Sequence, residues 1–321
     1  MPWNEVELIR VAANGINFEV AQLGSGDRLA LCLHGFPEHA YSWRHQMPLL
    51  ARLGYRVWAP NLRGYGGTDS PQEVSAYRLE TLVADVAGLI RASGAAETLL
   101  VAHDWGGVLA WTLAMQEPSL ISRLVIMNLP HPACFTREFR HPRQFLKSWY
   151  MMFFQLPVLP EMLLRRGDGR AAALAIRNSA KDAARFPEEA MAVYSRNANR
   201  PGGLTAMINW YRALIRSGGL GGGGRDYPKI EIPTLFLWGD ADVALDFSTT
   251  NGTEAYVSNL TFRVLHGVSH WVQQEAPEAV NAMLEAWLTG LPVPEFSEIP
   301  QKPSAQPSFR ESEPPISTPR A

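Results

Sequence analysis

This 321-residue sequence has few cysteines, no long apolar run and almost no net charge. Cys32 and Cys134 are too few for a disulfide framework and lack the spacing of a zinc site. No apolar run approaches the ~18 residues of a membrane span, and MPWNEVELIRVAANG lacks the basic and apolar regions of a signal peptide. Lys and Arg total 29 against 31 Asp and Glu, so charge gives no case for nucleic acid or an anionic membrane. We therefore expect a cytoplasmic enzyme or binding protein with no nucleic-acid or membrane partner.

Short apolar runs recur along the chain and alternate with helical patterns. They lie at residues 29–33, 55–58, 98–101, 124–126 and 234–237. Continuous runs of this kind are typical of strands that are covered on both faces, and hence of a mostly parallel sheet. Apolar residues from Leu79 to Ile90 fall at helical spacing, and a second helix is predicted from Gly106 to just before Pro118. The alternation predicts a doubly wound α/β architecture.

The strand pattern stops near Pro130 and resumes at Ile232. The intervening stretch is rich in Met, Phe, Trp and Ala, indicates several helices, and ends in the glycine-rich segment 218–224. An excursion that leaves a sheet and returns to it predicts a cap inserted over the strand ends. We predict a core of residues 1–130 and 226–290, a helical cap at 131–225, and a disordered, proline-rich tail at 291–321, which has few apolar residues to bury.

The segment VAHDWGG at residues 101–107 passes directly from a predicted strand into a predicted helix. Ala102 and Gly106 flank Asp104 two positions away on either side, and this spacing permits a sharp turn that presents one side chain above the sheet. In the nucleophile elbow G-x-S-x-G the presented residue is a serine, whereas here it is Asp104. The alternative is that Asp104 only caps the helix N-terminus, a role that Asp fills well.

A carboxylate nucleophile restricts the chemistry. With a reference pKa of about 3.9, it is ionised at neutral pH without a base. Its attack on an acyl carbon would give a reactive anhydride, whereas attack on a strained or halogenated saturated carbon gives an ordinary ester. Epoxides and alkyl halides are therefore the expected substrates, and the expected intermediate is a covalent alkyl-enzyme ester.

Hydrolysis of such an ester needs a base, an orienting acid and an oxyanion site. His270, which follows a glycine turn in GVSHW, is the candidate base. Asp242 in WGDAD is the preferred acid and Asp240 its competitor, and the order nucleophile, acid, histidine matches the α/β-hydrolase order. The backbone N–H groups of Phe36 and Trp105 are the predicted oxyanion donors.

Taken together, HGFPEHAYSWRHQ, NLRGYGGTDSP, HDWGG, LWGDAD and HGVSHWVQQEAPE resemble the epoxide hydrolases of the α/β-hydrolase fold, from about residue 10 to 290. The resemblance implies two cap tyrosines that donate to the epoxide oxygen. Their segments are similar to WYMMFFQ and NWYR, which gives Tyr150 and Tyr211. His34 and His103 are interpreted as structural members of their motifs and stay outside the catalytic set.

The resulting hypothesis is an enzyme that converts epoxides to vicinal diols with water and without a metal or organic cofactor. Its apolar cleft is predicted to use Phe36, Trp105, Phe153 and Phe154 for substrate binding. The first alternative is a haloalkane dehalogenase that uses the same Asp–His–Asp residues. A ligand receptor without turnover is the second alternative. The expected oligomeric state is a monomer or a homodimer.

Overall fold

A central sheet carries the fold in this computed structural model, which describes residues 3–219 and 227–300. The strands run in the spatial order β1-β2-β4-β3-β5-β6-β7-β8. β2 pairs antiparallel with β1 and β4, and every other neighbouring pair is parallel. The bounds are β1 (Glu7–Ala13), β2 (Ile16–Leu23), β3 (Arg28–Leu33), β4 (Tyr55–Pro60), β5 (Glu97–His103), β6 (Arg123–Met127), β7 (Thr234–Gly239) and β8 (Leu260–Leu265). The apolar runs expected to form strands lie in β3 to β7, so the predicted mostly parallel sheet is confirmed.

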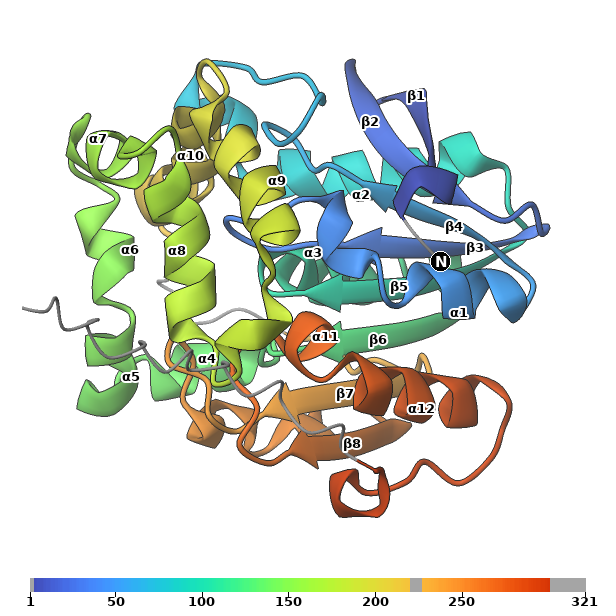
Figure 1. Ribbon diagram of the computed structural model, residues 1–321. Coiled ribbons are helices and arrows are strands. Elements are labelled where there is room, and N and C mark those ends of the chain that lie inside the picture. The colour runs from blue at the N-terminus through green and yellow to red at the C-terminus, as the bar shows by residue number, and fades with distance from the viewer. Residues whose placement is uncertain (1–2, 220–226, 301–321) are drawn as a thin grey trace, which may run out of the picture.

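Helices cover both faces of this sheet because its strands are apolar on both sides (Figure 1). On β5, Leu100 and Ala102 pack with α2 and α3, whereas Leu99 and Val101 pack with α1 and α12 on the other face. The bounds are α1 (Met47–Arg52), α2 (Leu79–Ser93), α3 (Trp105–Gln116), α11 (Val272–Glu275) and α12 (Pro277–Leu288). α2 and α3 are the two helices that the sequence predicts between strands.

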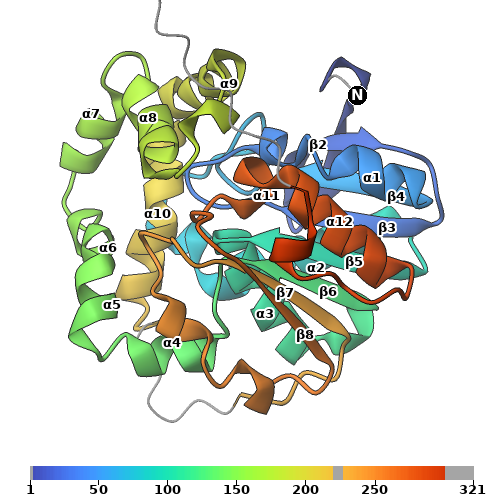
Figure 2. The ribbon, with the colours of Figure 1, turned by 60° about the horizontal axis from the view of Figure 1, so that its bottom comes forward.

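Between β6 and β7 the chain leaves the sheet and forms a layer of helices over the carboxyl ends of the strands. Figures 1 and 2 show this layer along one side of the molecule, with α5, α6 and α7 at its outer edge. Its helices are α4 (Pro132–Glu138), α5 (Pro142–Lys147), α6 (Trp149–Phe153), α7 (Leu159–Arg165), α8 (Arg170–Ser179), α9 (Glu188–Asn199) and α10 (Gly203–Arg216). We propose this layer as the cap; residues 220–225 of the predicted cap range, and residue 226 of the predicted core, lie outside the described residues.

The segment after α12 differs from the expected tail. Val293 is buried, its carbonyl oxygen accepts a hydrogen bond of 2.7 Å from Arg263, and Phe296 and Ile299 pack against the α1/α12 side of the core. The expectation of disorder is therefore wrong for residues 291–300, because the apolar side chains of Val293, Phe296 and Ile299 pack against the core. Residues 301–321 lie outside the described part of the chain. Within the described ranges, none of the helices combines the length and apolar character needed to cross a bilayer.

Candidate active site

Asp104 occupies the sharp turn between β5 and α3. Its φ of 49° and ψ of −122° are unusual for a residue with a side chain, and such strain is common at functional sites. Two close approaches need glycine: a Cβ at Gly106 would lie 2.3 Å from the Leu33 carbonyl oxygen, and one at Gly35 would lie 2.3 Å from Asp104 Oδ1. The Asp104 side chain makes no capping hydrogen bond to α3. The turn therefore presents the carboxylate for another purpose than capping.

His270 lies between two carboxylates. Its Nε2 atom is 3.5 Å from Asp104 Oδ2, and its Nδ1 atom is 2.6 Å from Asp242 Oδ2. Asp240, the competing acid, is exposed and instead accepts a 2.7 Å hydrogen bond from the Gly267 N–H and lies 2.8 Å from His266. The structure therefore brings Asp104, His270 and Asp242 together and leaves Asp240 outside the set.

The Asp242 carboxylate is held by groups from three segments. Its Oδ1 atom accepts from the Ala244 and Leu245 N–H groups at 2.8 and 2.9 Å, and its Oδ2 atom accepts from Asn128 Nδ2 at 2.8 Å. Burial alone would raise the pKa of Asp242, but charged His270 and these hydrogen bonds outweigh burial and hold it below its ordinary value. Asp242 is thus fixed in position as an anion.

The balance between burial and neighbouring charges also sets the protonation of His270 and Asp104. Burial disfavours protonation of His270, but the carboxylates of Asp242 and Asp104 outweigh burial and raise the pKa of His270 to about 10. Burial also opposes ionisation of Asp104, yet the hydrogen bond and charge of His270 hold the pKa of Asp104 below its ordinary value. At neutral pH the site therefore holds an imidazolium between two carboxylates.

The loop after β3 supplies a backbone donor to this site. The Phe36 N–H, which the sequence predicts to be an oxyanion donor, donates to Asp104 Oδ1 at 2.7 Å. The loop is anchored by buried Glu38, which accepts from the Gly35 N–H and from His103 Nδ1, both at 2.8 Å. His103 Nε2 lies 2.9 Å from the carbonyl oxygen of His270. His103 thus connects the oxyanion loop to the His270 loop from behind the site, in keeping with its expected structural role.

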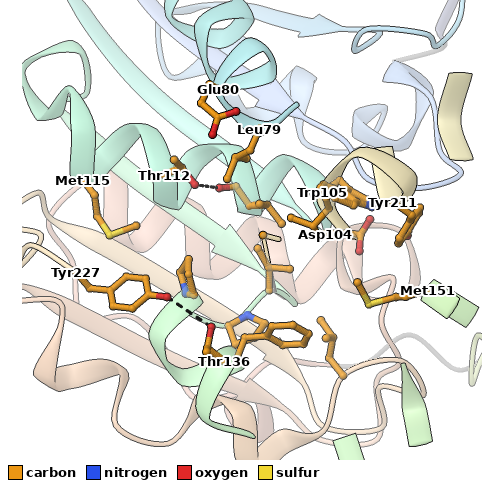
Figure 3. Close-up of a pocket in the computed structure, with 18 of the residues that line it drawn as sticks. Leu79, Glu80, Asp104, Trp105, Thr112, Met115, Thr136, Met151, Tyr211 and Tyr227 are labelled. Atoms are coloured by element: carbon orange, nitrogen blue, oxygen red, sulfur yellow. Dashed lines mark hydrogen bonds between the residues drawn. The ribbon is translucent and has the colours of Figure 1, made fainter. Parts of the chain in front are cut away.

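A cavity of about 640 Å³ opens above Asp104, between the cap and the core (Figure 3). Tyr150 of α6 and Tyr211 of α10 both line it, and their ring centroids lie 5.8 Å apart. Burial raises the pKa of both Tyr150 and Tyr211, and the negative charge of Asp104 raises both pKa values further. Both phenols therefore keep their protons and can act as hydrogen-bond donors.

Of the four aromatic residues predicted to bind substrate, the structure places one on the cavity lining. Trp105 lines the cavity, whereas Phe36, Phe153 and Phe154 are not among its lining residues. Phe36 and Phe154 instead pack edge-on against each other and against Tyr211, with centroid separations of 5.0–5.2 Å. These two phenylalanines support a wall of the site from behind.

The sequence of this chain is similar to a known protein family and to curated relatives. Residues 31–277 match the family model described as the alpha/beta hydrolase fold. A curated relative, AB hydrolase superfamily protein YfhM of Bacillus subtilis, is 39% identical over 87% of this chain and 96% of its own length. Epoxide hydrolase 4 of Mus musculus is 35% identical over 87% of this chain and 78% of its own.

Solved structures agree with the sequence relatives. The epoxide hydrolase of Bacillus megaterium, in complex with an inhibitor, has a TM-score of 0.81 and 28% identity, covering 88% of this chain and 100% of that one. The enzyme VrEH1 of Vigna radiata has a TM-score of 0.79 and 29% identity, covering 91% and 100%. The chain belongs to the epoxide hydrolases of the α/β-hydrolase family. The resemblance stated from the sequence motifs is thereby confirmed.

Two residues of this epoxide-hydrolase site were missed by sequence reasoning. Asn128 follows β6, has a φ of 42°, and binds Asp242 across 114 positions of sequence. Glu38 carried a signal in the HGFPE segment, but its partner His103 lies 65 positions away. Neither contact is visible in local sequence, because both depend on which strands become neighbours in the sheet.

Proposed function

We propose that the protein hydrolyses epoxides through a covalent ester on Asp104. In the first stage an Asp104 carboxylate oxygen attacks a ring carbon and forms a C–O bond. The C–O bond of the ring breaks, and the departing oxygen takes a proton from Tyr150 or Tyr211. The observation that carries this proposal is that charged Asp104, 3.5 Å from His270, and two phenols that keep their protons line the same cavity.

Ester formation changes the charge around His270 in the direction that the second stage requires. It removes the negative charge of Asp104, one of the two carboxylates that raise the pKa of His270. The His270 proton can then replace the one given up by the tyrosine. Neutral His270, still hydrogen-bonded to Asp242, is left as a base.

In the second stage His270 Nε2 takes a proton from water, and the water oxygen attacks the carbonyl carbon of the Asp104 ester. The Phe36 and Trp105 N–H groups stabilise the oxyanion. The bond from the former carbonyl carbon to the alkyl oxygen then breaks, and that oxygen takes the second proton of the water, which leaves the vicinal diol, the Asp104 carboxylate and protonated His270. One oxygen of that carboxylate then comes from water. A cytoplasmic location and a monomeric or homodimeric state stay predictions.

Replacing His270 by Gln tests this sequence of steps. The His270→Gln variant should consume about one equivalent of styrene oxide and accumulate a protein whose Asp104 peptide is heavier by one substrate. The Asp104→Asn variant is the control and should gain no mass. Turnover by the His270→Gln variant at the wild-type rate would refute the mechanism, and halide release from bromoalkanes that exceeds epoxide turnover would favour the dehalogenase alternative.

A further inference from the structure

The cavity above Asp104 is elongated and follows one side of α3. From this helix it takes Trp105, Val108, Thr112, Met115 and Gln116. Their spacing keeps them on one face, and at 1.5 Å per residue the stretch from Trp105 to Gln116 covers about 16 Å. Figure 3 shows Asp104 and Tyr211 toward one end of the cavity and Met115 and Tyr227 toward the other.

The character of the lining changes along this length. Most of the lining is apolar: Val108 lies one turn along α3 from Trp105, and Leu129, Phe135, Leu214 and Leu245 also face the cavity. The lining also includes the exposed side chains of Glu80 and Gln116, and toward the Met115 end the hydroxyl group of Tyr227 lies 3.5 Å from that of Thr136 (Figure 3). In a ligand that extends from Asp104 toward this end, an apolar segment would therefore contact the apolar lining, and a polar or solvated end would lie at the opening.

Three aromatic rings pack together next to Asp104, and we define Phe36, Phe154 and Tyr211 as the aromatic wall. Each pair of these rings has a centroid separation of 5.0–5.2 Å, and Phe154 is 5% exposed. Phe36 and Phe154 do not line the cavity. A substrate held at Asp104 thus has room for a long substituent in one direction only.

Building on the hydrolase function proposed above, we propose that the protein acts on terminal epoxides carried by a linear apolar chain of about ten to twelve carbons with an uncharged far end. The length follows from carbon–carbon bonds of about 1.5 Å, which in a zigzag advance about 1.25 Å per atom along about 16 Å. Among the described lining residues the charged side chains are Asp104 and Glu80, both acidic. A terminal carboxylate on the substrate would therefore be repelled by exposed Glu80, and none of the described lining residues is a cation that could pair with it.

Three neutral epoxides test the shape of the site. The value of kcat/KM for 1,2-epoxydodecane should exceed that for 1,2-epoxybutane by at least about tenfold, since each additional buried methylene contributes up to about fourfold. It should also exceed that for the isomer 6,7-epoxydodecane by about tenfold, because the second pentyl group meets the wall. Equal values for either pair would overturn the inference. If the protein hydrolysed none of the three epoxides, that result would instead refute the proposed function.

A variant of the wall tests its role directly. The Phe154→Ala variant should raise the ratio of kcat/KM for 6,7-epoxydodecane to that for 1,2-epoxydodecane by about fivefold or more, because removing the ring opens the second direction. The control Phe262→Ala removes a half-buried ring from β8, away from the cavity lining, and should leave this ratio unchanged. An unchanged ratio in a folded Phe154→Ala protein would overturn the role of the wall.

The outer end is tested by charge and by size. The anion 11,12-epoxydodecanoate should be hydrolysed about threefold more slowly than its methyl ester at low salt, and Glu80→Gln should reduce that difference. The Met115→Trp variant should lower kcat/KM for 1,2-epoxydodecane while 1,2-epoxybutane, which does not reach Met115, is little affected. A preference for the free acid over the ester would overturn the uncharged far end, and equal effects of Met115→Trp on both chains would overturn the length argument.

Discussion

Replacing Asp242 by Asn separates ester formation from ester hydrolysis. In the native site Asp242 Oδ1 accepts two backbone N–H groups at 2.8 and 2.9 Å, and these keep an oxygen at that position in the variant. The new amide NH₂ must then face Asn128 Nδ2 and His270 Nδ1. Asn128 cannot turn to offer its oxygen, because that oxygen already accepts from the Gly239 N–H at 2.9 Å while its Nδ2 donates to the Gly239 carbonyl at 3.2 Å.

This arrangement stabilises the His270 tautomer that cannot act as a base at Nε2. An amide that donates to His270 Nδ1 places the ring proton on Nε2, the atom that must accept a proton from water. In a serine protease triad the equivalent Asp→Asn change lowers kcat about 10⁴-fold for this reason. We expect kcat of the Asp242→Asn protein to fall about 10³- to 10⁴-fold, whereas the Asp104 carboxylate continues to form the ester.

Rapid-quench mass spectrometry measures the two stages separately. With excess 1,2-epoxydodecane, the Asp242→Asn variant should show one rapid equivalent of alkylated Asp104 followed by very slow diol release. The Asn128→Leu variant serves as a milder comparison for Asp242, because it removes one hydrogen bond to that carboxylate, together with the two to Gly239, and keeps the charge of Asp242. Steady-state turnover of Asp242→Asn within tenfold of wild type, or an absence of accumulated ester, would refute the reasoning.

Three further predictions concern the tyrosines, the titration of the site and the buried Glu38. Tyr150→Phe and Tyr211→Phe should each lower the single-turnover alkylation rate by about 10- to 100-fold, and an unchanged rate in both would exclude them as donors. The Asp104→Asn substitution should lower the pKa of His270 from about 10 by at least about one unit in an NMR titration, since it removes one of the carboxylates. In the wild type the raised His270 pKa stabilises the fold most below its unfolded value of about 6.5, so this contribution to the free energy of unfolding should decline as pH rises toward about 10. Glu38→Gln should reduce the free energy of unfolding in urea by about 3 kcal/mol, because it breaks a buried pair; a loss below about 1 kcal/mol would contradict this account.

The parallel strands could be predicted from the sequence because both of their faces are buried and their apolar runs are continuous. The β1–β2 hairpin was missed for the opposite reason. β1 has only Val11 and Ala13 buried, and Glu7 and Arg10 interrupt its apolar residues, so it lacks the long continuous run of a strand that is covered on both faces. Its turn does carry a signal, since Asn14 and Gly15 have positive φ angles of 46° and 76° and Asn-Gly is a typical hairpin turn.

The site was predicted where its residues lie in compact motifs and missed where it depends on tertiary packing. Asp104 directly follows β5 and His270 lies in the short loop between β8 and α11, and their motifs give their positions. The choice between Asp240 and Asp242 required the three-dimensional path of the loop after β7. The placement of Phe153 and Phe154 on the cavity lining was not reproduced, because sequence spacing does not determine which side of a short helix faces the cleft.

The central claim is that an oxygen of Asp104 enters the product. A single turnover of styrene oxide in ¹⁸O-labelled water, with enzyme in excess, tests it most directly. We expect unlabelled diol from the first turnover and ¹⁸O in the Asp104 peptide. Labelled diol together with an unlabelled Asp104 peptide would mean that water attacks the epoxide itself, and this result would contradict the covalent mechanism.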